Sequence, residues 1–155
     1  MMKKLLTFAF ALFTTFAFAQ TFVSTTPENK KVVLEEFTGI SCTFCPDGHV
    51  IGQGLHDANP NDVFLINIHA GGYANPQGVG TDFRTSFGAA IDAQSGLAGY
   101  PAGTVNRHNF PGLEQGSSGA TAMGRSNWAN ATAQTLAISS PVNVATQASV
   151  DLSTR

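Results

Sequence analysis

The sequence predicts an α/β fold in which a central sheet is flanked by helices. Two near-continuous apolar stretches, residues 32–37 and 63–68, are typical of strands that are covered on both faces. A helical segment separates them, and a strand–helix–strand order with a short connection favours a parallel pair. A third short strand after Pro101 and a later helical pattern extend the same layered arrangement.

The first 19 residues are expected to be a signal peptide rather than part of the fold. Lys3 and Lys4 precede an apolar run, and Ala17-Phe18-Ala19 is a small-x-small cleavage pattern before Gln20. The run is short for a membrane span, although an uncleaved anchor is the alternative. Removing it changes the formal net charge from −2 to −4, because two lysines are lost. An acidic chain without a basic patch argues against nucleic acid as a partner.

Residues 20–30 are polar and predict a flexible lead-in to a domain over residues 31–140. Its first strand covers residues 31–38, and Ser41 is a candidate cap for a helix that begins near Cys42. Proline is tolerated only in the first turn of a helix, so Pro46 places the helix start close to the cysteines. Asn59-Pro60 predicts its end.

The second half of the domain is predicted with weaker patterns. After a glycine-rich loop at residues 70–80, Thr81 is expected to cap a helix that reaches about residue 94, with Phe83 and Phe87 on one apolar stripe. Residues 102–107 predict a short strand, residues 108–119 a loop, and residues 124–138 a helix. Alternating apolar residues from Val142 onward suggest that residues 141–155 begin a truncated β-rich segment.

Cys42 and Cys45 are the strongest chemical signal in the chain. They are the only two cysteines, and their spacing puts the sulfurs one helical turn apart. A thiol at a helix N-terminus has its pKa lowered, so Cys42 is the expected nucleophile and Cys45 the resolving thiol. The alternative is an inert disulfide, but a bridge across so short a loop contributes only about 2 kcal/mol of stability.

Glu36 lies within the apolar first strand, six residues before Cys42. A buried carboxylate there would have a raised pKa and could accept the proton of the resolving thiol. Alternatively, Glu36 or its neighbour Glu35 points to solvent.

A metal site is the third possibility for this region. Cys42, Cys45, His49 and His69 are of the types that bind zinc or copper, but helical geometry separates them, and we expect no metal and no cofactor. Tyr100-Pro101 is a candidate substrate-binding element if its peptide bond is cis, because the preceding backbone groups would then be open for pairing.

These residues resemble the thioredoxin-like superfamily. The likeness rests on the first strand, the Cys42-Thr43-Phe44-Cys45 pair, the second strand and Pro101 before a third strand. It implies a thioredoxin-like central sheet, Cys42 as the attacking thiol, Cys45 as the resolving thiol and Pro101 as a cis proline. Glu36 stands where thioredoxins carry a buried acidic residue.

A closer resemblance is to the family related to a twenty-eight-kilodalton outer-membrane protein of Gram-negative bacteria. Residues 33–39, the pattern Cys42-x-x-Cys45-Pro46-x-x-His49 and residues 100–107 look like its signature blocks. This implies an exported protein of the periplasm, outer membrane or cell surface. From the cysteine pair itself we expect disulfide exchange with protein or small-molecule thiols. The alternative is a surface-binding module with a structural, non-catalytic disulfide.

Overall fold

The computed structural model describes residues 23–154, so the signal peptide expected at residues 1–19 lies outside the described residues. The described chain forms two compact units, Asn29–Ser139 and a smaller one made of residues 23–28 and 140–154. In the smaller unit the Asn143 amide donates to the carbonyls of Ser24 and Thr26, at 2.8 and 2.7 Å. Its only helical element is the short 3₁₀ helix η4 (Leu152–Thr154), as far as the structure describes it. The β-rich extension proposed for residues 141–155 stays a prediction.

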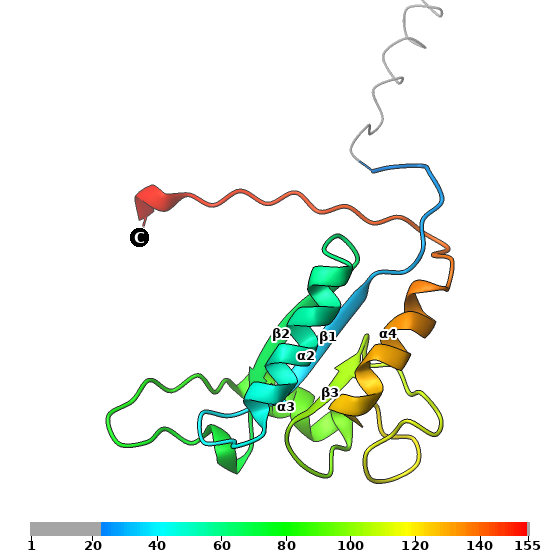
Figure 1. Ribbon diagram of the computed structural model, residues 1–155. Coiled ribbons are helices and arrows are strands. Elements are labelled where there is room, and N and C mark those ends of the chain that lie inside the picture. The colour runs from blue at the N-terminus through cyan, green and yellow to red at the C-terminus, as the bar shows by residue number, and fades with distance from the viewer. Residues whose placement is uncertain (1–22, 155) are drawn as a thin grey trace, which may run out of the picture. The chain divides into compact units, whose positions relative to one another are not determined.

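The larger unit is built on a four-stranded mixed sheet, which confirms the predicted α/β class (Figure 1). The strand order is β2-β1-β3-β4. β1 (Val32–Thr38) is parallel to β2 (Val63–His69), as the strand–helix–strand pattern predicted. It is antiparallel to β3 (Ala102–Val105), which in turn pairs antiparallel with β4 (Met123–Gly124).

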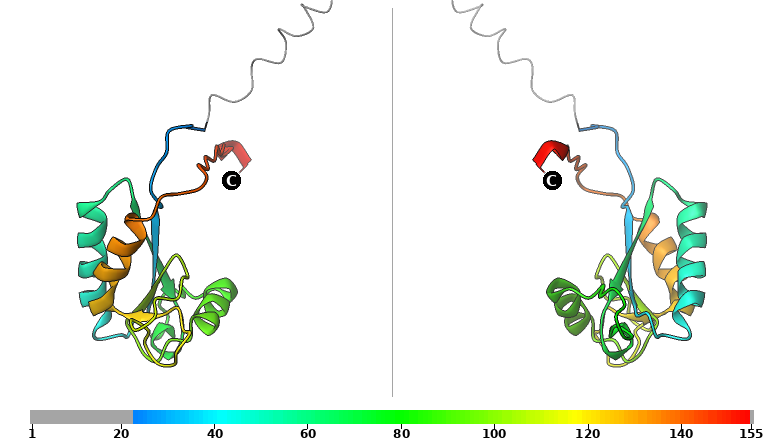
Figure 2. Two further views of the ribbon diagram at one scale, coloured as in Figure 1. Left: turned by 90° about the vertical axis from the view of Figure 1, so that its right-hand side faces the viewer. Right: turned by 90° about the vertical axis from the view of Figure 1, so that its left-hand side faces the viewer.

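Three α-helices cover the two faces of this sheet. Figure 2 shows α2 (Cys45–Ala58) and α4 (Trp128–Leu136) on one face and α3 (Ser86–Ser95) on the other. Two 3₁₀ turns, η2 (Gly72–Ala74) and η3 (Arg125–Asn127), lie in the connections. Within residues 23–154 no helix has the length and apolar character needed to cross a membrane.

β1 divides its side chains between two cores, because successive residues of a strand point to opposite faces. Leu34 joins the core beneath α2 and α4, whereas Phe37 joins the core on the α3 side. Trp128, the largest fully buried side chain, fills the first core, and its indole N–H donates to the Met123 carbonyl at 3.2 Å. β1 is therefore the central strand that the sequence predicted.

β2 departs from the prediction that it is covered on both faces. It is the edge strand of the sheet, and its side chains Phe64 and Ile66 are 47% and 48% exposed. Gly88 of α3 lies against Ile68 near the end of the strand. Because α3 is short, the first half of β2 remains open on that side.

α3 begins four residues later than predicted, and the reason is local. The Asp82 carboxylate accepts from the backbone N–H and the guanidinium of Arg84, an arrangement that competes with helix formation. Thr85, not Thr81, is the cap, and its hydroxyl accepts from Gly88 N–H at 2.9 Å. The apolar stripe was also wrong in part, since Phe83 and Phe87 are exposed.

The helix predicted over residues 124–138 is shorter in the structure. Residues 123–124 form β4 instead, η3 follows, and α4 starts only at Trp128. Trp128 packs directly on β3, since a Cβ at Gly103 would lie 2.9 Å from two of its ring atoms. A two-residue strand carries too little pattern to be recognised from sequence.

Candidate active site

Cys42 and Cys45 are joined by a disulfide at the start of α2, with their Cα atoms 5.4 Å apart. The Cys45 N–H donates to the Cys42 carbonyl, which closes a tight turn between the two residues. Cys42 is 8% exposed and Cys45 1% exposed. The two cysteines are thus unequal, and Cys42 is the more exposed of the two.

The helix start differs from the sequence prediction. α2 begins at Cys45, not near Cys42, and its cap is Phe44, which makes no side-chain capping bond. Ser41 is not a cap; its N–H donates to the Tyr73 carbonyl at 3.0 Å. Because the Cys42 sulfur is bonded to that of the first helical residue, it still lies at the helix N-terminus, where partial positive charge favours a thiolate.

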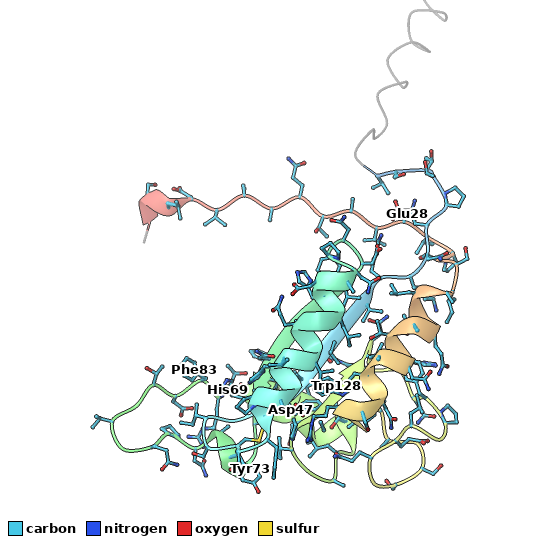
Figure 3. All side chains as sticks on the ribbon, in the orientation of Figure 1. Glu28, Asp47, His69, Tyr73, Phe83 and Trp128 are labelled. Carbon is cyan, nitrogen blue, oxygen red and sulfur yellow. A yellow bond between two sulfur atoms is a disulfide. The ribbon has the colours of Figure 1, made fainter. Side chains whose placement is uncertain are left out.

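The loop before the cysteines is held by the segment around η2. Gly39 approaches it so closely that a Cβ would lie 2.3 Å from the Tyr73 carbonyl carbon. The Tyr73 ring meets the Tyr100 ring edge-on at 5.8 Å between centroids. Figure 3 shows the disulfide at the same end of the sheet as the labelled Tyr73 and His69. Tyr73 therefore connects the cysteine loop to the loop of Tyr100.

The Tyr100–Pro101 peptide bond is cis, as the resemblance implied. The Pro101 ring lies against the first turn of α2, since its Cβ is 3.3 Å from the position of a Cβ at Gly48. The Tyr100 hydroxyl donates a hydrogen bond to Asp92 of α3 at 2.7 Å. Burial, and then that bond, raise the pKa of Tyr100. The ring of Tyr100 is therefore engaged by Asp92 and Tyr73 within the fold.

Glu36 is buried, so the alternative that it points to solvent is wrong. Its side chain is only 5% exposed, and its Oε2 lies 3.0 Å from His49 Nδ1. The other oxygen, Oε1, has no hydrogen-bond partner among residues 23–154 and lies 2.5 Å from the position of a Cβ at Gly48. Gly48 follows Cys45 by three residues, so this oxygen lies against the first turn of α2, which begins at Cys45. Burial raises the pKa of Glu36, and His49 opposes that rise.

Glu35 is also buried, but it faces the other side of the sheet and has a different role. The Arg107 guanidinium donates to both of its carboxylate oxygens, at 2.7 and 2.5 Å. Arg107 is able to do so from a left-handed backbone conformation, with φ of 49°. Glu35 is therefore the ion-pair partner of Arg107, and Glu36 is the carboxylate that lies against the first turn of α2.

His49 is the residue of this site whose role was missed from sequence. It lies four residues after Cys45, its side chain is 40% exposed, and its Nε2 is 3.4 Å from the Thr38 hydroxyl. His69 is close by, and burial followed by the charge of His49 lowers its pKa. The sequence feature that could have predicted the contact of His49 with Glu36 is a glutamate within an apolar strand together with a histidine one turn beyond the second cysteine.

No group of three or more histidine, cysteine, aspartate or glutamate residues in the described chain is placed to hold a metal ion. Cys42 and Cys45 are bonded to each other, and His49 is engaged by Glu36.

Two glycines of α2 give a matched pair of stability predictions. Gly48→Ala places a Cβ against Glu36, Trp128 and Pro101 at 2.5, 3.2 and 3.3 Å. We expect this overpacking to lower the free energy of unfolding by about 1–3 kcal/mol. Gly54→Ala meets nothing within 4 Å and should raise it by up to about 1 kcal/mol, through helix propensity alone. Urea denaturation of both variants checks the prediction, and equal effects would contradict the packing described here.

The buried carboxyl of Glu36 predicts a pH-dependent stability. Because burial raises its folded-state pKa above the ordinary 4.5, the folded protein binds more protons than the unfolded chain between the two values. The free energy of unfolding should therefore fall as pH rises through that window. Glu36→Gln removes this titration, so its stability relative to wild type should improve as the pH rises from 4.5 through the folded-state pKa of Glu36. A pH series of urea denaturation curves measures this, and a constant difference between the two proteins would refute it.

Comparison of the chain with protein-family models, with curated proteins and with solved structures gave no match.

Proposed function

We propose that the larger unit is a thioredoxin-like domain that carries out thiol–disulfide exchange at Cys42 and Cys45. The observation that carries this proposal is the arrangement around the first turn of α2. A disulfide lies at the turn, a buried carboxylate lies beneath it, and a cis proline packs against it. The strand order and the helices on both faces of the sheet are compatible with that fold.

The exchange reaction uses the inequality of the two cysteines. In the reduced protein the Cys42 thiolate attacks one sulfur of a partner disulfide, and the other partner sulfur leaves and takes a proton from water. Cys45 then loses its proton to the Glu36 carboxylate and attacks Cys42 Sγ. This re-forms the protein disulfide and releases the second partner thiolate, which is protonated in turn. Two electrons pass from the protein to the partner, and the reverse sequence oxidises a partner dithiol.

The partners and the location follow from the same proposal. Protein or small-molecule thiols and disulfides are the substrates, and the chain needs no cofactor because the two cysteines carry the electrons. The signal-like residues 1–19 favour export, which would place the dithiol where disulfides form and persist. The family resemblance adds the periplasm, outer membrane or cell surface of a Gram-negative bacterium as the site of action.

One observation favours the second candidate, a surface-binding module with a quiescent disulfide. Even Cys42, the more exposed of the two cysteines, is only 8% exposed. A structural disulfide would be resistant to reduction, whereas an exchanging one should equilibrate with common dithiols.

Catalysed reduction of insulin by dithiothreitol tests the proposal. The full chain, in micromolar amounts, is expected to shorten the lag before insulin precipitates, relative to dithiothreitol alone. A lag equal to that of dithiothreitol alone, with the Cys42–Cys45 disulfide still intact, would instead support the binding module.

A further inference from the structure

The contacts of Glu36 show how a proton could leave a buried site. Its Oε1 is unpartnered in the described chain and lies against the first turn of α2, while its Oε2 is held by His49. Glu36 itself is almost fully buried, so its proton has no direct route to water. The His49 ring touches the carboxylate on one side and is 40% exposed on the other.

We propose that His49 is the route by which buried Glu36 exchanges its proton with solvent, and that it sets the pH range in which Cys45 can be deprotonated. This inference rests on the proposed function and deepens it. His49 does not touch the sulfurs in this account; it acts through Glu36 and is a positioning residue.

The step conserves protons. Oε1 of Glu36 accepts the proton of the Cys45 thiol, and one proton passes from the carboxyl group through the His49 ring to water. Glu36 and His49 then hold as many protons as they did before the step. Cys45 becomes a thiolate, and no electron passes through the pair.

The charges around His49 set the sign of its effect. Glu36 and the Thr38 hydroxyl face it from β1, and His69 faces it from β2. Asp47, its neighbour in the first turn of α2, is paired with Arg125. Both the charge of His49 and its hydrogen bond lower the pKa of Glu36 against the effect of burial. Without His49, Glu36 should stay protonated to higher pH and accept no thiol proton there.

The test separates the two sulfurs with 5,5′-dithiobis(2-nitrobenzoate) as the disulfide. Attack by Cys42 releases a first thionitrobenzoate, and resolution by Cys45 releases a second. Stopped-flow absorbance gives both rates for the reduced full chain between about pH 5 and about pH 9. His49→Gln is expected to leave the first release within about twofold and to slow the second at least fivefold near pH 7. The midpoint of the second release should move up by about one pH unit.

His56→Gln is the matched control. His56 lies on the same helix two turns further on, but its Nδ1 contacts the backbone carbonyl of Val63 at 2.7 Å, not a carboxylate. It should leave both releases and the midpoint unchanged. Glu36→Gln is the second test variant and should slow the second release at every pH where the wild type is fast.

The outcomes distinguish a failure of the proposed thiol–disulfide exchange from a failure of the role of His49 alone. A first release in wild type no faster than that of free cysteine would remove the proposed function itself. A normal first release, with an unmoved midpoint in His49→Gln, would overturn the role of His49 alone. Equal slowing of both releases would assign His49 a structural role and would also overturn the inference.

Discussion

Replacing Cys42 by serine is expected to lower the rate of insulin reduction at least about a thousandfold, to the dithiothreitol background. We expect a partner to react with Cys42, because Cys42 is 8% exposed and Cys45 only 1%. Serine is nearly the same size, so the fold should persist. The disulfide itself contributes only about 2 kcal/mol, since it closes a very short loop.

Cys45→Ser is the matched variant for this prediction. It should retain the first attack, since Cys42 is intact, but should accumulate a mixed disulfide between Cys42 and the substrate because no thiol resolves it. Mass spectrometry of the unreduced protein detects that adduct. If Cys42→Ser instead formed the adduct and Cys45→Ser did not, the assignment of attacking and resolving thiols would be reversed.

Trp128→Ala is expected to cost about 3–5 kcal/mol of folding free energy, the largest stability loss predicted for a single side chain here. Trp128 is fully buried, packs against Gly103 of β3, and reaches Gly48 in the first turn of α2. Its removal opens a cavity and takes away the indole donor to the Met123 carbonyl. Since domains of this size are stable by only about 5–15 kcal/mol, much of the total would be lost.

Urea denaturation with the disulfide intact measures this loss. Phe87→Ala is the control, because Phe87 is also aromatic but is 81% exposed on α3, and it should change stability by less than about 0.5 kcal/mol. A loss below about 1 kcal/mol for Trp128→Ala would contradict the packing of α4 onto the sheet.

The sequence was sufficient for the parts of the fold that depend on strong local patterns. The apolar runs of β1 and β2 predicted their parallel pairing, and Asn59 predicted the end of α2. The patterns failed where a local contact competed with them. Asp82 and Arg84 delay the start of α3, and the turn that Cys42 forms with Cys45 delays the start of α2.

The site was predictable in its chemistry but not in its connections. Their spacing identified the cysteines as a candidate pair, whereas the sequence left open whether Glu36 is buried or points to solvent. Whether the Glu36 carboxylate meets His49 depends on how α2 is rotated on the sheet, which is a property of tertiary packing. The exposed half of β2 has the same origin, because it depends on how far α3 extends across the sheet.

The rate of alkylation of Cys42 as a function of pH shows whether the N-terminus of α2 activates this thiol. The reduced full chain is treated with iodoacetamide across a pH series, and Cys42 is resolved from Cys45 by peptide mass spectrometry. Its position at the N-terminus of α2 predicts a pKa for Cys42 well below the usual value of about 8.5, so alkylation should already be fast at neutral pH. A titration centred at or above about 8.5 would show a Cys42 thiol that the helix does not activate, and would contradict the account.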